Sequence, residues 1–158
     1  VGFVNRTVSA GYRTRAVLAD LVPSINKSGA TAFIDREAYA LVRYLLFADE
    51  AKFPTSGVDG EPRLLKDFSK NSRRNQKGLS LKDFDLSTRI FRFRCSYMIY
   101  SDSFTGLPVE LKTRVFHRLD KVLSSESSGT DFDYLPTSEK RTIRSILRET
   151  LSGLPKGW

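Results

Sequence analysis

The sequence contains only one cysteine and one histidine in 158 residues. A single cysteine excludes an internal disulfide and any cysteine-rich zinc cluster, because both need several thiols. A single histidine argues against a histidine-based metal site, and the Cys-x-x-Cys-His motif that attaches haem is absent. We therefore expect neither a metal ion nor another cofactor.

Long apolar runs are absent as well. The longest, such as YLLFA at 44–48, are much shorter than the roughly 20 residues that cross a bilayer. The chain begins at Val1, and no basic stretch followed by an apolar run, as in a secretory signal, stands near the start. We expect a chain without a membrane span that is mature, trimmed or a module of a longer polypeptide.

The chain does contain enough apolar material for one core, with 40% hydrophobic and 11% aromatic residues. Helical spacing of apolar residues dominates, and caps or prolines bound most of the periodic segments. We therefore predict one all-α domain over 1–158, a compact bundle of about five helices. In the first helix Val8, Tyr12 and Ala16 form the expected inward stripe. The predicted helices are the N-terminal one before Pro23, within an N-terminal unit 1–31 that ends in a linker, then 33–52 with Asp35 as its cap, 86–103, 108–124 and 138–152.

The most unusual stretch is RIFRFRCSYMIYS at 89–101, which combines three arginines, four aromatic residues and the cysteine. As a strand, the segment alternates for only about five residues and Ile90 falls out of phase. As a helix capped by Asp85 or Ser87, it places Ile90, Phe93 and Tyr97 on one face. We therefore predict a buried helix here.

Residues 55–80 show no sustained period and gather Gly, Pro, Asn, Ser and basic residues. We predict a long loop, anchored in its first half by Leu64, Leu65 and Phe68. The loop lies in the basic part of the chain, because residues 61–95 hold 10 basic and 4 acidic side chains, or +6 of the net charge of +8. This uneven charge is the strongest pointer to a partner.

We predict a non-catalytic interaction or scaffold module whose basic surface docks an anionic partner or another part of its parent protein. Among anionic partners, a protein is favoured over other anions. A nucleic-acid-binding module is the first alternative, because basic and aromatic residues are close together in this segment. Helix-turn-helix, zinc-finger, KH and RNP signatures are absent. The oligomeric state is left open. The predicted binding residues are Arg73, Arg74, Lys77, Arg89 and Arg92.

A Cys/His enzyme is the second alternative. The turn between two predicted helices could bring Cys95 near His117, and Arg92 and Arg94 would lower the pKa of the thiol if they pointed towards it. However, a cysteine among aromatic residues is more often a small buried hydrophobe. P-loop, dinucleotide-binding, Gly-x-Ser-x-Gly and His-Glu-x-x-His motifs are absent. We leave the question of an enzyme open, with the balance against catalysis.

Three stretches resemble a known group of sequences: LVRYLLFADE, NQKGLSLKDFDLSTRIFRFRCSYMIYSDSFTGLP and RETLSGLP. They are similar to the C-terminal region of uncharacterised bacterial proteins of planctomycete and acidobacterial type, and the most specific part is Cys-Ser-Tyr-x-Ile-Tyr-Ser. The resemblance covers about residues 40–158. It implies a module of a longer chain and an exported or periplasmic location, with a cytoplasmic one left open. It implies no reaction, cofactor or catalytic residue.

Overall fold

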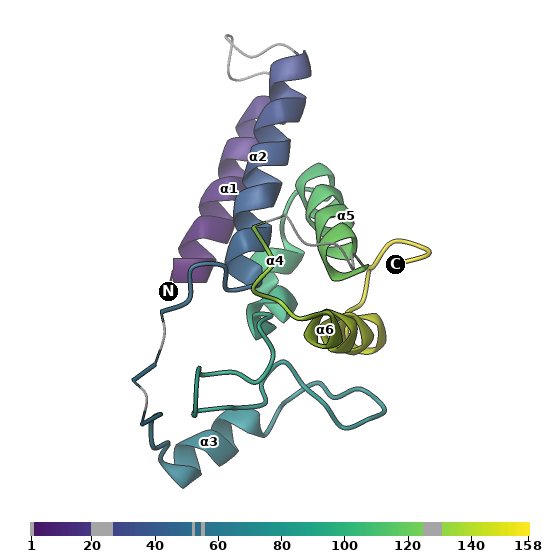
Figure 1. The fold of residues 1–158 in the computed structure, drawn as a ribbon. Coiled ribbons are helices and arrows are strands. Elements are labelled where there is room, and N and C mark those ends of the chain that lie inside the picture. Colours follow the sequence, from purple (N-terminus) through teal and green to yellow (C-terminus); the bar gives the residue numbers. More distant parts are fainter. Residues whose placement is uncertain (1, 20–26, 52, 55, 125–130) are drawn as a thin grey trace.

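The computed structural model describes residues 2–19, 27–51, 53–54, 56–124 and 131–158. Within these ranges the chain is helical, and its one β pairing is an isolated antiparallel bridge between Phe84 and Phe91. The predicted all-α bundle is therefore confirmed (Figure 1). The elements are α1 (Gly2–Leu18), α2 (Lys27–Leu45), α3 (Pro62–Ser69), the 3-10 helix η1 (Tyr97–Tyr100), α4 (Asp102–Thr105), α5 (Val109–Ser124) and α6 (Thr137–Thr150).

The core forms where α2, α5 and α6 meet. α2 packs against both α1 and α5, and α5 packs against α6. Figure 1 shows α1 and α2 as a long antiparallel pair, with α5 beside α2 and α6 below α5. The predicted helices 108–124 and 138–152 match α5 and α6, and their apolar faces are buried as expected. Core side chains exposed by no more than 2% include Leu41, Leu45, Leu111, Val115, Leu119, Ile143, Ile146 and Leu147.

The second helix begins earlier than the predicted range 33–52. Residues 27–31, expected to be linker, form the first turn of α2, and Asp35 lies within the helix instead of capping it. The Asp35 carboxylate accepts a hydrogen bond from Arg114 of α5 (2.6 Å). Ile34 of this helix is buried, with 4% exposure. Burial of such a side chain is worth about 1.5–3 kcal/mol, more than the roughly 1 kcal/mol that a glycine such as Gly29 costs within a helix.

The same helix ends earlier, at Leu45, where tight turns replace the predicted continuation to residue 52. Phe47 adopts the left-handed conformation with φ of 56°. The Ala48 amide donates to the Arg43 carbonyl (2.9 Å), and the Glu50 amide donates to the Phe47 carbonyl (3.1 Å). The chain therefore leaves the bundle here and runs towards α3 (Figure 1).

The first helix buries a face other than the predicted one. Val8 and Tyr12 are exposed, by 40% and 67%. The buried face of α1 instead carries mainly small residues, which allow the close approach of α2. Pro23, the predicted end of this helix, lies outside the described residues. The pattern misled because two threonines belong to the buried face. That face consists of Phe3, Thr7, Ala10, Gly11, Thr14 and Val17.

The predicted helix at 86–103 is wrong. The chain instead doubles back as a hairpin-like turn, in which the Leu86 amide donates to the Arg89 carbonyl (2.8 Å). The Thr88 hydroxyl donates to the Asp85 carboxylate (2.5 Å), so Asp85 closes a turn instead of capping a helix.

The segment that follows this turn is irregular: residues 92–95 bend, and the Cys95 amide donates to the Phe93 carbonyl (2.8 Å) in a tight turn. Phe93 and Cys95 are buried, with 7% and 0% exposure, whereas Arg92 is exposed. The chain then crosses the end of α2, where the Ser96 amide donates to the Leu45 carbonyl (2.7 Å). Within 86–103 helix is limited to η1 and α4, and the alternative strand is not found either.

The predicted basic loop at 55–80 is not one continuous loop, because it contains α3. The Glu61 carboxylate caps this helix by accepting a hydrogen bond from the Leu64 amide (2.7 Å). Leu64 is 66% exposed, whereas Leu65 and Phe68, the other two predicted anchors, are partly buried. We call the ring group around Phe68 the aromatic cluster: Phe68 with Phe84, Phe91 and Tyr97, at centroid distances of 5.2 to 5.9 Å from the Phe68 ring.

Side chains supply the hydrogen bonds of the backbone where residues 70–85 lack helix and strand. Asn75 is only 6% exposed, and its side-chain oxygen accepts a hydrogen bond from the Leu79 amide (2.9 Å). The Glu149 carboxylate of α6 accepts one from the Gln76 amide (2.7 Å). The bond to Glu149 attaches residues 70–85 to the C-terminal half of α6.

We expect Asn75→Ala to lower the free energy of unfolding by about 1–3 kcal/mol, because it removes the acceptor of a partly buried amide. Urea denaturation followed by circular dichroism measures this change. Asn71→Ala, at an exposed position of the same segment, is the control and should change stability by less than about 0.5 kcal/mol. Equal stability of the two variants would show that Asn75 does not hold the segment.

Candidate functional site

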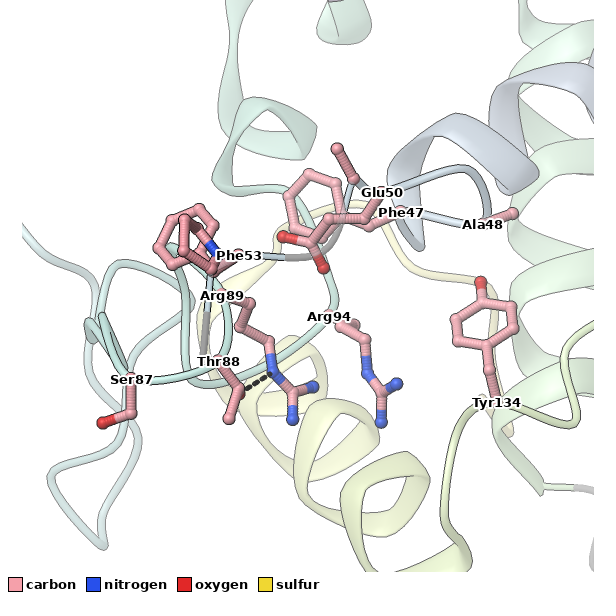
Figure 2. A pocket seen from close by; sticks show the side chains of 11 residues that line it. Phe47, Ala48, Glu50, Phe53, Ser87, Thr88, Arg89, Arg94 and Tyr134 are labelled. Atoms are coloured by element: carbon pink, nitrogen blue, oxygen red, sulfur yellow. Dashed lines mark hydrogen bonds between the residues drawn. The ribbon is translucent and has the colours of Figure 1, made fainter. Parts of the chain in front are cut away.

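A cleft of about 590 Å³ lies between the turns that follow α2 and the turn at 86–89 (Figure 2). We call it the α2 cleft. Its apolar wall comes from the chain just after α2, and two of its charged side chains come from the turn at 86–89 and from the irregular segment that follows it. The apolar wall contains Phe47, Ala48, Ala51, Phe53 and Pro54; Tyr134, Glu50, Arg89 and Arg94 complete the main lining.

Backbone strain is concentrated beside the α2 cleft. Phe47 (φ 56°) lines it, and Leu86 (φ 61°) directly precedes the lining residue Ser87. These two are the non-glycine residues of positive φ in the described part of the chain. A left-handed conformation costs such residues of order 1 kcal/mol or more, and it persists only where the surroundings hold it. Strain of this kind clusters at ligand sites.

Arg94 is fixed by the Glu139 carboxylate of α6. Its Nη2 donates to Oε2 (2.6 Å), and its backbone amide donates to Oε1 (2.7 Å). Both side chains are largely buried, with 17% and 11% exposure. The Tyr134 ring lies 5.4 Å from the Arg94 guanidinium, and its hydroxyl donates to the Leu46 carbonyl (2.9 Å). Burial raises the pKa of Tyr134, so its hydroxyl stays neutral at ordinary pH.

Arg89 lies beside Arg94 in the cleft (Figure 2) but has much weaker partners. Its Nη1 is buried without a hydrogen-bond partner. The nearest carboxylate oxygens are 3.6 Å away on Asp85, from Nε, and 3.7 Å away on Glu139, from Nη1. Within the described part of the chain, only Nε donates a hydrogen bond, a long one of 3.3 Å to the Thr88 hydroxyl. The Arg89 guanidinium thus retains unused donor capacity.

Glu50 places a carboxyl group against these two arginines. Desolvation by burial raises the pKa of Glu50, and the charges of Arg89 and Arg94 oppose the rise only in part. Glu139 and Asp85 raise it further. The hydrogen bond from Thr88 lowers the pKa of Asp85 itself, so that carboxyl group stays ionised. The positive charge of the α2 cleft is therefore largely balanced by carboxylates.

A second groove, of about 200 Å³, has positive charge without that balance. We call it the Arg73 groove; its lining includes Arg73, Lys82, Tyr97 and Tyr100, and none of the residues that line it is acidic. Neither cation forms an ion pair among the described residues. Arg73 donates to the Thr150 carbonyl (3.2 Å) and lies 4.7 Å from the Tyr100 ring centre.

Lys82 is held in a similar way on the other side of the Arg73 groove. Its Nζ donates to the Phe68 carbonyl (3.2 Å) and lies 4.7 Å from the Phe68 ring centre, over the aromatic cluster. Tyr100 donates to or accepts from the Thr150 hydroxyl (2.6 Å), and burial raises the pKa of Tyr100 to about 12. Both cations are therefore positioned by rings and carbonyls that leave their charge in place.

Basic side chains of α6 continue this surface. A groove of about 430 Å³ lies between Gln76 and the arginines of α6. Arg144 donates to the Asp120 carboxylate (2.7 Å), whereas Arg148 is exposed and forms no ion pair among the described residues. The Glu149 carboxylate at this groove already accepts a hydrogen bond from the backbone amide of Gln76. We call Arg73, Lys77, Lys82 and Arg148 together the basic surface.

The structure distributes the five predicted binding residues over different places. Arg73 lines the Arg73 groove, and Lys77 is exposed on the same segment. Arg74 pairs with Asp83 (3.0 Å) and donates to the Gly78 carbonyl. Arg89 lines the α2 cleft, and the guanidinium of the exposed Arg92 lies 5.3 Å from the Phe93 ring centre.

Sequence reasoning missed Lys82, Arg148 and the α2 cleft. Lys82 belongs to the basic segment that we singled out, but nothing in its spacing distinguishes it from its neighbours. Arg148 lies at helical spacing from Arg141 and Arg144, on the side of α6 away from its apolar face. That spacing is the signal that could have identified it.

The two candidate catalytic residues lie in different environments. Cys95 is 0% exposed, and burial together with the charge of Glu139 raises the pKa of its thiol to about 12. His117 is exposed on α5 and lines a separate groove of about 410 Å³ with Asp35, Arg114 and Lys121. The structure thus does not bring the two side chains into one cleft, and the thiol lacks the conditions that favour a thiolate.

No family model, curated protein or solved structure matches this chain. Among the residues that the structure describes, no helix has the length and apolarity to traverse a bilayer, and no three His, Cys, Asp or Glu side chains are grouped to hold a metal ion.

We expect Glu139→Ala to lower the free energy of unfolding by about 2–4 kcal/mol, because it leaves a largely buried guanidinium and the Arg94 amide without their acceptor. Chemical denaturation measures the loss. Glu110→Ala, at an exposed position of α5, is the control and should have little effect. A loss of less than about 0.5 kcal/mol in Glu139→Ala would contradict the anchoring role of this carboxylate.

We also expect Cys95 to react with iodoacetamide at least roughly a hundredfold more slowly in the native protein than in urea, because reaction requires opening of the core. Mass spectrometry of timed samples gives both rates. His117→Ala should leave the native rate unchanged. A fast native reaction that His117→Ala slows would instead support the Cys/His enzyme.

Proposed function

We propose that this chain is a non-catalytic interaction module that docks an acidic segment of a protein, in a partner or in its parent polypeptide, on the basic surface. The observation that carries the proposal is the Arg73 groove, in which two cations share a lining without any carboxylate. Elsewhere in the described chain, carboxylates neutralise arginines such as Arg94, paired with Glu139, and Arg144, paired with Asp120. An unpaired pair of cations is therefore the feature that an anion would recognise.

The cations of the Arg73 groove are held before any partner arrives. Arg73 and Lys82 each rest on an aromatic ring and donate to a backbone carbonyl. Fixing long side chains in advance reduces the conformational entropy that binding would otherwise cost. Carbonyls and ring faces also orient the charge without cancelling it, so the attraction for carboxylates remains.

An acidic protein segment fits this surface better than a single-stranded nucleic acid does. Binding of single strands relies on aromatic faces that are free to stack on bases. The rings nearest the Arg73 groove are used in the aromatic cluster or covered by cations, as with Tyr97 and Tyr100. Tyr12, which is strongly exposed, lies on α1, away from the basic segment (Figure 1).

Duplex nucleic acid is the second candidate, and the arginines of α6 favour it. Arg141, Arg144 and Arg148 recur at three- and four-residue spacing beside Gln76. Such a row can follow a phosphate backbone. Arg144 is already paired with Asp120, however, which reduces its share.

The test is a binding titration with a fluorescein-labelled peptide of alternating glutamate and serine, followed by fluorescence anisotropy at low salt. We expect Arg73→Glu combined with Lys82→Glu to weaken binding roughly tenfold or more, because two attractive contacts become repulsive. A fluorescein-labelled DNA duplex is titrated in parallel at several salt concentrations.

Arg63→Glu combined with Lys66→Glu is the matched control, because both residues are exposed on α3 and the change in net charge is identical. Similar weakening in the two double variants would mean that only net charge matters and would overturn the proposal. Tighter binding of the duplex than of the peptide, with a steep salt dependence, would favour the nucleic-acid function. Circular dichroism confirms that each variant is folded.

A further inference from the structure

The α2 cleft has no part in the proposed function. None of the residues that line it also lines the Arg73 groove or the groove along α6. Its volume of about 590 Å³ is within the range of small-molecule pockets. A ligand in this cleft would therefore not occupy the basic surface.

The cleft combines an apolar wall with a polar end. Phe47, Phe53 and Pro54 form much of the wall, and Figure 2 shows the side chains of Arg89 and Arg94 lying beside each other across from Glu50. The Phe47 ring is itself fixed by stacking on Phe91, with 6.2 Å between ring centres. Small-molecule sites typically have such an apolar lining with a few oriented polar groups.

Arg89 is the cleft residue that has a donor without an acceptor, at Nη1. The Arg94 guanidinium, by contrast, is held by Glu139, with 2.6 Å between Nη2 and Oε2. Arg89 has ion-pair distances of 3.6 and 3.7 Å and a buried Nη1 without any hydrogen bond. The Arg89 side chain is 25% exposed, so a bound acceptor would use donor capacity that its present weak partners leave open.

Backbone strain beside the cleft is a further feature typical of ligand sites. Phe47 and Leu86, on its two sides, both have the left-handed backbone conformation. Neither residue has a side chain that favours this conformation. The turn at Leu86 positions Arg89 directly, because the Leu86 amide donates to the Arg89 carbonyl. The strained backbone thus holds the unused guanidinium at the cleft.

We propose that the α2 cleft binds a small monocarboxylate with a planar apolar body, whose carboxylate pairs with Arg89 and whose body lies against Phe47 and Phe53. A guanidinium matches a carboxylate with two parallel hydrogen bonds, which gives the site its preference for this group. The aromatic wall selects a flat apolar body over a bare anion.

Glu50 tunes this site. Its carboxyl group faces Arg89 and Arg94, with Glu139 and Asp85 also within electrostatic reach. An ionised Glu50 repels a bound carboxylate and competes for the arginines. Because its pKa is raised, Glu50 takes up its proton at a higher pH than an ordinary glutamate does. A permanent anion in the cleft therefore binds more tightly as the pH falls towards that pKa.

The experiment is a nuclear magnetic resonance titration of the ¹⁵N-labelled protein with three probes of similar shape: 2-naphthoate, naphthalene-2-sulfonate and 2-naphthalenemethanol. We expect 2-naphthoate to shift the signals of residues 47–51 and 87–94, and to bind roughly tenfold more tightly than the neutral alcohol. Inorganic sulfate, which lacks an apolar body, should shift these signals far less.

Variants then test the assigned groups. Arg89→Ala should weaken 2-naphthoate binding roughly tenfold, whereas Arg92→Ala, at an exposed position three residues away, should leave it unchanged. Glu50→Gln should strengthen binding of naphthalene-2-sulfonate roughly threefold and remove its pH dependence. Because Glu50→Gln removes no anchor of the fold, it keeps the proposal testable if Arg89→Ala does not fold.

Several results would overturn the proposal. The alcohol could bind as tightly as 2-naphthoate, or 2-naphthoate could fail to bind at millimolar concentration. The shifts could centre on the Arg73 groove, which would assign the anion to the basic surface. Equal binding by Arg89→Ala and Arg92→Ala, both folded, would also exclude Arg89 as the carboxylate partner.

Discussion

The ion pair of Arg94 with Glu139 is the interaction on which the irregular half of this structure depends. One carboxylate at the start of α6 accepts both the guanidinium and the backbone amide of Arg94, with contacts of 2.6 and 2.7 Å. The two residues are separated by 45 positions in the sequence. An irregular segment without a ladder of strand hydrogen bonds needs such acceptors, because unpaired backbone groups cannot be buried at low cost. The same contact fixes the arginine that borders the α2 cleft.

The two candidate sites follow from how the remaining cations are satisfied. Where carboxylates are close, as at Glu139, positive charge is neutralised and contributes to the fold. Where only rings and carbonyls are available, as around Arg73 and Lys82, the charge is oriented but remains open to a partner. Arg89 lies between these cases, since its carboxylate partners are near but beyond hydrogen-bond distance. The degree of neutralisation, more than the number of basic residues, therefore separates structural from binding arginines.

The sequence predicted the regular half of the fold well. α5 and α6 were identified with nearly correct bounds, because an apolar stripe at helical spacing directly reports the face that a helix buries. The start of α2 was misplaced, because Gly29 and its polar neighbours have the composition of a linker although they form the first turn of the helix. This error is local, and the helix bundle was still recognised.

The irregular half could not be predicted from local patterns. Residues 86–103 fit a helical stripe, but the long-range contacts of Arg94 with Glu139 and of Ser96 with Leu45 hold this part of the chain in an irregular conformation. In that conformation Phe93 and Cys95 are buried. The same limit applies to the sites: charge density located the segment that contains Arg73, but only the fold shows that Arg74 is neutralised by Asp83 and that Arg89 faces a cleft.

The most direct test of the role of the Arg94–Glu139 contact is native-state hydrogen exchange of the Arg94 and Ser96 amides, followed by nuclear magnetic resonance. We predict strong protection of both amides, close to that of core amides in α5, because they donate to Glu139 and to the Leu45 carbonyl within one cooperative unit. Fast exchange of both amides alongside protected α5 amides would contradict this role. The segment would then be only loosely attached to the bundle, and neither site could be preorganised.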